Sequence, residues 1–150
     1  MPANLGELSG HAMLLMPQVI PAYVNQLGNN LKAGSKGYAY IFDQVPPGWR
    51  RNGMPAIHGM EVNYVFGLSK VSDWETVFPG PANPNPELSD SDSKVAEAMM
   101  RMWAQFAKTG APSIPGHIEW PAWEPATDLY LYITDPLQVR AGFSKIVPQK

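Results

Sequence analysis

The sequence contains no cysteine, so the chain forms no disulfide, and a thiol nucleophile is excluded. It also has little net charge. With 11 basic and 13 acidic side chains the formal charge is -2, which provides no basic field for a phosphate backbone, so nucleic acid is not expected as a partner. Long apolar runs are absent too. The longest clusters, 12–16 and 38–42, are far shorter than the roughly 20 residues that cross a bilayer, and no membrane span is expected.

The start of the sequence has neither a basic region nor an uninterrupted apolar region, so no secretory signal is expected there. The compartment stays open, because a cysteine-free chain fits both the cytosol and an exported protein. A length of 150 residues with 45% apolar content suits one compact segment, 1–150. The 16 prolines and 13 glycines fall mainly between periodic segments, which indicates short elements joined by long loops.

The first half of the chain predicts one helix and one strand. Apolar residues at helical spacing over 12–31, interrupted by Pro17 and Pro21, predict a broken or short helix that ends near Gly28 to Asn30. The aromatic and β-branched run 37–43 predicts a strand, near 38–42, that is buried on both faces and needs a neighbour on each side. Prolines and glycines in 44–57 predict a loop without regular structure. The apolar stripe of the helix consists of Leu15, Val19, Tyr23, Leu27 and Leu31.

The second half of the chain predicts the main helix near 90–108, where Ser89 and Asp92 resemble a capping box and Gly110 ends the helix. A short helix over 60–68 precedes it. The intervening segment 71–93 has five acidic and no basic side chains, which favours a solvated loop. The apolar stripe of the main helix consists of Val95, Met99, Met102, Trp103 and Phe106.

A second strand is predicted over 129–133, and with the first strand and the main helix it indicates an α/β fold. Just before it, Trp120 and Trp123 lie in a proline-rich loop. We interpret both tryptophans as covering a core edge rather than forming a carbohydrate platform. The methionines and Trp103 of the main helix are interpreted as core packing.

His58 is the candidate catalytic residue, because it lies on a loop that follows a buried strand and opens a helix. Imidazole exchanges a proton near neutral pH, Gly59 removes bulk beside the ring, and Glu61 would lie on the same side of the starting helix. A histidine that only anchors or caps the loop is the alternative. No metal site is expected, since His11 and His117 have no metal-like spacing to His58.

A catalytic histidine needs a nucleophile, and without cysteine that nucleophile is a serine. In hydrolases with the order serine, acid, histidine, both partners precede the histidine. Ser9 lacks the G-x-S-x-G glycines, and Ser35 follows a predicted helix where a nucleophile elbow follows a strand, so Ser35 is interpreted as a turn serine. The upstream acids are Glu7 and Asp43, and Asp43 is interpreted as a strand-end cap or loop anchor.

Four sequence blocks stand out in the order Gly37 to Asp43, Ala56 to Gly67, Met100 to Pro112, and Trp120 to Trp123. In this order they resemble the C-terminal part of type-B carboxylesterases, the family of bacterial para-nitrobenzyl esterases, animal carboxylesterases and cholinesterases. The resemblance runs from about residue 15 to about residue 145, and Val45-Pro46-Pro47-Gly48 looks more bacterial than animal.

The resemblance implies the C-terminal part of an α/β-hydrolase fold, with strands near 38–42 and 129–133. It implies that His58 is the catalytic histidine of a Ser-Glu-His triad, that Glu61 is a buried group supporting it, and that Met54 and Met60 contact the substrate. The substrate class is a small-molecule carboxylic ester, and no cofactor is implied.

Family members are several times longer than this chain, and their serine elbow, oxyanion loop and triad glutamate lie N-terminal to the matched region. Either a second chain supplies those parts, or this chain is a separated piece of a larger gene. In both cases we expect a serine carboxylesterase that is active only with its N-terminal part, the carboxylesterase fragment or subunit that carries the serine. The alternative is a non-catalytic, cholinesterase-like interaction module.

Overall fold

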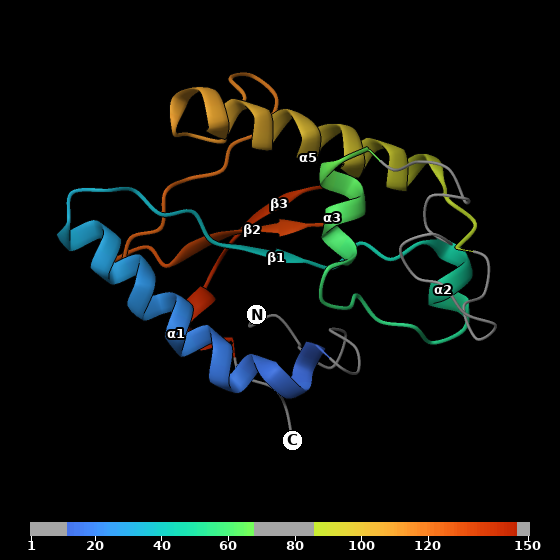
Figure 1. Ribbon diagram of the computed structural model, residues 1–150, viewed down its shortest axis with the longest axis horizontal. Helices are drawn as coiled ribbons and strands as arrows, with labels where there is room; N and C mark the ends of the chain where they lie inside the picture. Colours follow the sequence, from blue (N-terminus) through green and yellow to red (C-terminus); the bar gives the residue numbers. More distant parts are fainter. Residues whose placement is uncertain (1–11, 68–85, 147–150) are drawn as a thin grey trace.

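The computed structural model describes residues 12–67 and 86–146. Within them a three-stranded sheet has the order β1-β2-β3, with β1 parallel to β2 and β2 antiparallel to β3. Figure 1 shows this sheet between α1 and the pair α3 and α5. The elements are α1 (Ala12–Lys32), β1 (Tyr40–Phe42), α2 (Pro47–Arg51), α3 (Met60–Val65), α5 (Asp90–Thr109), β2 (Leu129–Ile133), β3 (Gln138–Ala141) and the 3-10 helix η2 (Phe143–Lys145).

The strand β1 is covered on both faces, as the sequence predicts, although its regular part is shorter than 37–43. Ala39 and Ile41 pack into the core cluster on the α1 side of the sheet. Tyr40 and Phe42 point the other way and pack against the cluster formed with α3 and α5. This alternation follows from the two-residue period of a strand. The sheet therefore separates two hydrophobic cores.

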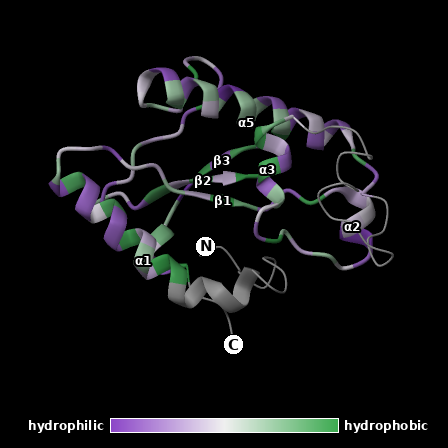
Figure 2. Ribbon diagram, viewed as in Figure 1, coloured by the Kyte–Doolittle hydropathy of each residue, from purple (hydrophilic) through white to green (hydrophobic). Residues whose placement is uncertain are grey.

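The helix α5 confirms the prediction for 90–108 almost to the residue. The Ser89 side chain and the Asp92 backbone and carboxylate form the expected capping box, and Gly110 ends the helix with a φ of 74°. Figure 2 shows hydrophilic and hydrophobic stretches alternating along this helix. Met99 and Met102 are fully buried, whereas Met100 and Phe106 remain exposed. The predicted interpretation as core packing therefore holds for two of the methionines.

The two loop tryptophans cover the core, as predicted. Trp120 belongs to the cluster under α3 and α5, and its indole N–H donates to the carbonyl of Ala39 at 3.0 Å. Trp123 belongs to the cluster under α1, and its indole N–H donates to the Asp128 carboxylate at 2.8 Å. Each tryptophan thus has an internal partner for its polar atom.

The predicted interruption of the first helix is wrong, since α1 runs unbroken from Ala12 to Lys32 (Figure 1). Pro17 and Pro21 each lack an amide hydrogen and so remove one helical hydrogen bond. The apolar face of the helix compensates for this loss, because Ile20 is buried in the cluster with Tyr130 and Phe143. Tertiary packing therefore outweighs the local signal.

The buried face of α1 also differs from the predicted stripe. Ile20 is buried and Val24 and Leu27 are partly buried, whereas Tyr23 is 56% and Leu31 43% exposed. Each step of four residues advances about 40° around a helix, so a five-member stripe at that spacing spreads over about 160°. That arc is too wide for a single contact with the sheet. The face of α1 that packs on the sheet consists instead of Ile20, Val24 and Leu27.

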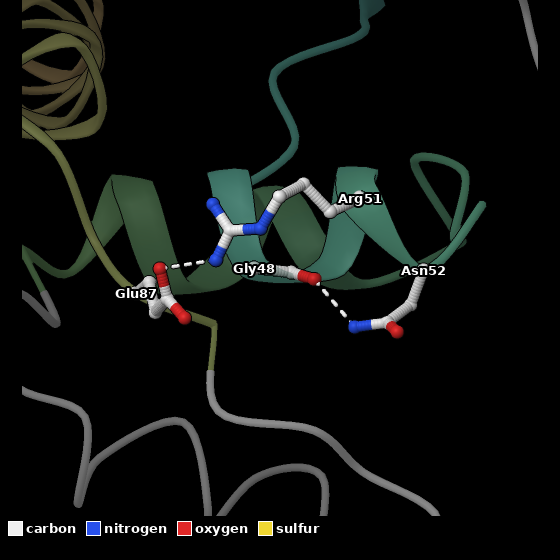
Figure 3. Close-up of polar contacts among 4 residues, drawn as sticks. All are labelled: Gly48, Arg51, Asn52 and Glu87. Atoms are coloured by element: carbon white, nitrogen blue, oxygen red, sulfur yellow. Dashed lines mark hydrogen bonds and ion pairs between the residues drawn. The ribbon is translucent and has the colours of Figure 1, made fainter.

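The loop predicted over 44–57 contains the short helix α2, which is a further correction. Pro47 stands at its start, where a missing amide hydrogen costs nothing because no helical acceptor precedes it. Trp49 is fully buried and anchors the turn. The side chain of Asn52 donates to the carbonyl of Gly48 at 2.7 Å and caps the other end (Figure 3).

The tail contains two elements that the sequence did not predict, β3 and η2. The strand β3 pairs with β2 through the register Tyr130↔Arg140 and Tyr132↔Gln138. It has only four residues, most of them exposed, so its alternation of polar and apolar residues is too short to predict a strand. The short helix predicted over 60–68 is confirmed as α3, whereas most of the predicted loop 71–93 lies outside the described residues. No helix in the described ranges is long and apolar enough to span a bilayer.

Candidate active site

His58 lies in a turn between α2 and α3, next to the carboxyl ends of the parallel strands. Phe42 pairs with Ile133, so β1 and β2 end at the same edge of the sheet, and Figure 1 shows α3 beside that edge. The turn is closed by a hydrogen bond from the Met60 amide to the Ile57 carbonyl at 3.1 Å. Gly59 has a φ of 86°, a left-handed conformation that a side chain would strain. The local sequence therefore builds the turn that presents His58.

The side chain of His58 is exposed, and it makes no hydrogen bond with any residue that the structure describes. An exposed imidazole on a tight turn can accept a proton from a group that approaches from solvent and return it to another. No serine or carboxylate of the described ranges lies in hydrogen-bond contact with it. The turn thus offers a proton-transfer group without the rest of a catalytic site.

Glu61 is only partly buried, in the first turn of α3, and it makes no hydrogen bond with a described residue. The resemblance implies a buried group at this position, so its supporting role stays a prediction. Burial, with a smaller contribution from the Glu61 carboxylate and then from Tyr23, raises the pKa of Tyr40 to about 12.

The two methionines expected to touch substrate differ in their surroundings. Met54 is partly buried at the edge of the core, where contact with a ligand stays a prediction. Met60 is fully buried and packs inside the cluster with Trp49 and Tyr64. Contact between Met60 and a substrate therefore also stays a prediction.

The serine candidates do not assemble a triad within the described residues. Ser35 is exposed just after the end of α1, and its amide donates to the Asn30 carbonyl at 2.9 Å, which fits a turn serine. Ser9 lies outside the described residues. Asp43 is buried and accepts a hydrogen bond from the Tyr132 hydroxyl, so it anchors the end of β1 to β2 as interpreted from the sequence.

The sequence did not reveal a buried polar cluster around Asp92. The carboxylate of Asp92 accepts hydrogen bonds from the side chains of Gln44 and Tyr64, each at 2.8 Å, in addition to its capping-box contacts with Ser89. Burial, followed by the Asp92 carboxylate, raises the pKa of the Tyr64 hydroxyl, which therefore remains a donor. The capping-box pattern in the sequence predicts the contacts of Asp92 with Ser89, but it does not predict its contacts with Gln44 and Tyr64.

The described ranges contain no group of three or more histidines and acids that could hold a metal ion. His117 is exposed in a loop far along the chain from His58, and His11 lies outside the described residues.

The sequence of the chain is similar to those of known carboxylesterases and cholinesterases. The profile of the family described as "Carboxylesterase family" matches residues 3–146. The chain is 32% identical over 127 residues to an acetylcholinesterase of Bungarus fasciatus and 29% identical over 140 residues to carboxylesterase 5A of Felis catus. These alignments cover 79% and 91% of this chain but only 18% and 23% of the relatives. The chain thus spans about a fifth of their length.

A solved structure of PNB esterase resembles the chain with a TM-score of 0.51 and 23% sequence identity. The likeness covers 69% of this chain and 19% of the solved one. It shows a common fold over that part.

Proposed function

Because the chain belongs to the carboxylesterase family and has a partial α/β-hydrolase fold, we propose that it supplies the catalytic histidine, His58, of a serine carboxylesterase. The substrate would be a small-molecule carboxylic ester. The serine, the triad glutamate and the oxyanion donors would belong to an N-terminal carboxylesterase fragment or subunit outside these 150 residues.

The position of His58 carries this proposal. It is an exposed imidazole on the tight turn that leads into α3, and α3 lies beside the edge where both parallel strands end (Figure 1). In open α/β sheets, ligands bind outside the carboxyl ends of the strands. Gly59 leaves one side of the turn without a side chain, so a second polypeptide can bring its serine hydroxyl close to the ring.

In the proposed reaction, His58 takes the proton of the serine hydroxyl as the serine attacks the ester carbonyl, and it then returns that proton to the departing alcohol. A carboxylate on the other fragment would orient the imidazole, and backbone N–H groups there would hold the oxyanion. In the deacylation step, His58 takes a proton from the attacking water and returns it to the serine oxygen. This chain contributes the proton relay alone.

The free edge of β1 supports the proposed partner. The carbonyl of Ala39 accepts from the Leu131 amide and the Asp43 amide donates to the Ile133 carbonyl, so these residues of the strand face β2. Because successive residues of a parallel strand alternate sides, the backbone polar groups of Tyr40 and Phe42 face away from β2. No described strand pairs with them there. An added strand from the other fragment would satisfy them.

We expect the amides of Tyr40 and Phe42 to exchange rapidly with solvent in the isolated chain and to become protected at least about tenfold when the N-terminal fragment is added. The Asp43 amide, which is bonded to β2, is the internal control. Amide hydrogen exchange measures all three. A monodisperse isolated chain with strong protection at Tyr40 and Phe42 would contradict the added strand.

The isolated chain is expected to hydrolyse p-nitrophenyl butyrate no faster than free imidazole, because nucleophile and oxyanion donors are missing. Mass spectrometry of the polypeptide that co-purifies with it identifies the partner for reconstitution. A partner with G-x-S-x-G that restores turnover supports the esterase, whereas a partner with the serine replaced supports the interaction module. Turnover by the isolated chain that Ser35→Ala abolishes would overturn the proposal.

A further inference from the structure

The carboxylate of Asp92 joins three parts of the chain that are distant in sequence. Its Oδ1 accepts from Gln44 Nε2 and from the Tyr64 hydroxyl, both at 2.8 Å. Its Oδ2 accepts from the Ser89 amide at 2.8 Å and from the Ser89 hydroxyl at 2.6 Å. Asp92 is only 3% exposed, so these four donors take the place of water around a buried acid.

Two of these donors stand at the two ends of the segment that carries His58. Gln44 follows β1 directly, and Tyr64 lies in α3, so residues 45–63 form a loop whose ends meet at one oxygen of Asp92. Gln44 also accepts a hydrogen bond from the Thr134 hydroxyl at 3.3 Å, which links the same point to the end of β2. Both ends of the segment that contains His58 are therefore held at the first turn of α5.

The middle of segment 45–63, which forms α2, contacts the residues just before α5. The amide of Gly48 in α2 donates to the Pro86 carbonyl at 2.8 Å. Arg51 of α2 forms an ion pair with Glu87, shown in Figure 3. Both side chains of that pair are more than half exposed, so the pair adds little to stability. The buried contacts of Asp92 therefore hold the two ends of the segment, and the burial of Trp49 holds its middle, more than this surface pair does.

We propose that Asp92 is a positioning residue for His58: by binding Gln44 and Tyr64 it fixes both ends of segment 45–63 and thereby the place of the imidazole. The inference rests on the proposed function, in which His58 transfers the proton. Removing the carboxylate removes the buried hydrogen bonds that Gln44 and Tyr64 donate to it, and it loosens the segment at both ends. A displacement of about 1 Å between reacting groups can cost about 10²-fold in rate.

The chain contains a matched control in Asp128. This acid is also buried, and it accepts hydrogen bonds from the Trp123 indole at 2.8 Å and from the Ser144 hydroxyl at 2.6 Å. It holds the tail of the chain and contacts no residue of segment 45–63. Its φ of 51° adds strain when alanine replaces it, so Asp128→Ala destabilises the fold at least as much as Asp92→Ala.

The experiment compares Asp92→Ala, Asp92→Asn and Asp128→Ala in the complete esterase, meaning this chain assembled with the fragment that supplies the serine. With p-nitrophenyl butyrate, Asp92→Ala is expected to lower kcat about 10- to 100-fold and to change KM less than about threefold. Asp92→Asn retains one acceptor oxygen, and the Gln44 amide and Tyr64 hydroxyl can reorient toward it, so it should recover part of the rate. Asp128→Ala should leave kcat within about threefold.

Amide exchange across 45–63 gives a second readout that does not depend on catalysis. We expect faster exchange there in Asp92→Ala and unchanged exchange in Asp128→Ala. Equal losses of kcat in Asp92→Ala and Asp128→Ala would overturn the proposal, because the loss would then reflect general destabilisation. Unchanged exchange across 45–63 in Asp92→Ala would overturn it as well.

His58→Ala separates this proposal from the proposed function. If His58→Ala is inactive while Asp92→Ala keeps its full kcat, only the role of Asp92 is wrong. If His58→Ala keeps its activity, the proposed function fails, and the positioning role of Asp92 for catalysis fails with it even where exchange across 45–63 increases.

Discussion

Replacing His58 with alanine is expected to lower kcat of the complete esterase by at least about 10³-fold with p-nitrophenyl butyrate as substrate. General acid and base catalysis alone contributes about 10²- to 10⁴-fold, and the members of a triad act as a unit. The stability should change by less than about 1 kcal/mol, since the side chain is exposed and makes no hydrogen bond with described residues. Steady-state kinetics and a melting temperature on the same preparation measure both quantities.

Ser35→Ala is the control for the His58 experiment. Ser35 is exposed beyond the end of α1 and belongs to no part of the proposed site, so its removal should leave kcat and the melting temperature unchanged. Glu61→Ala tests the supporting role that the resemblance implies, and a loss of rate there would support it. Retention of more than about a tenth of the activity by His58→Ala would make the histidine structural and the proposed mechanism wrong.

Trp120→Ala is expected to destabilise the fold by about 3–5 kcal/mol, the range for truncating a buried tryptophan. The side chain is 4% exposed, and its ring packs with the rings of Tyr38, Tyr40 and Trp103 at centroid distances of 6.2, 5.7 and 5.4 Å. Alanine removes all three contacts and leaves a cavity between the sheet and α5. Denaturant unfolding of the assembled protein measures the change in free energy.

Trp120→Phe separates packing from hydrogen bonding. Phenylalanine keeps an aromatic ring but loses the donor to the Ala39 carbonyl, which still accepts from the Leu131 amide at 3.0 Å. The expected cost is therefore clearly smaller than that of alanine. A cost below about 1 kcal/mol for Trp120→Ala would show that the aromatic cluster does not stabilise the sheet.

The elements that the sequence predicted well are those whose signals are local. The helix α5 has an apolar stripe, the Ser89 capping box and Gly110 within one continuous stretch. The strand β2 matches the predicted range 129–133. By contrast, β3 is recognisable only through its pairing with β2, and α2 depends on the burial of Trp49. Their own residues carry turn and polar patterns that do not predict regular structure.

The candidate site divides in the same way. His58 is a candidate from its place on the loop after the first strand, and the family motif around it implies its catalytic role, because both signals lie within a short stretch of sequence. The contacts of Asp92 join it to Gln44 and Tyr64 across 48 and 28 positions of sequence. Helical and strand periodicities describe only near neighbours, so no local pattern could bring these three residues together. Their meeting point is a property of the packed fold.

The two edges of the sheet have different consequences for self-association. On one side β3 is short and carries Gln138 and Arg140, whose side chains are hydrogen-bonded to each other, and such charged edges resist pairing. On the other side the run around Tyr40 and Phe42 is uncharged, and its outer edge is unpaired in the described sheet. Two copies that paired through this edge would each cover the edge of the other. We therefore expect misassembly of the isolated chain to stop at a closed dimer instead of continuing into a fibre.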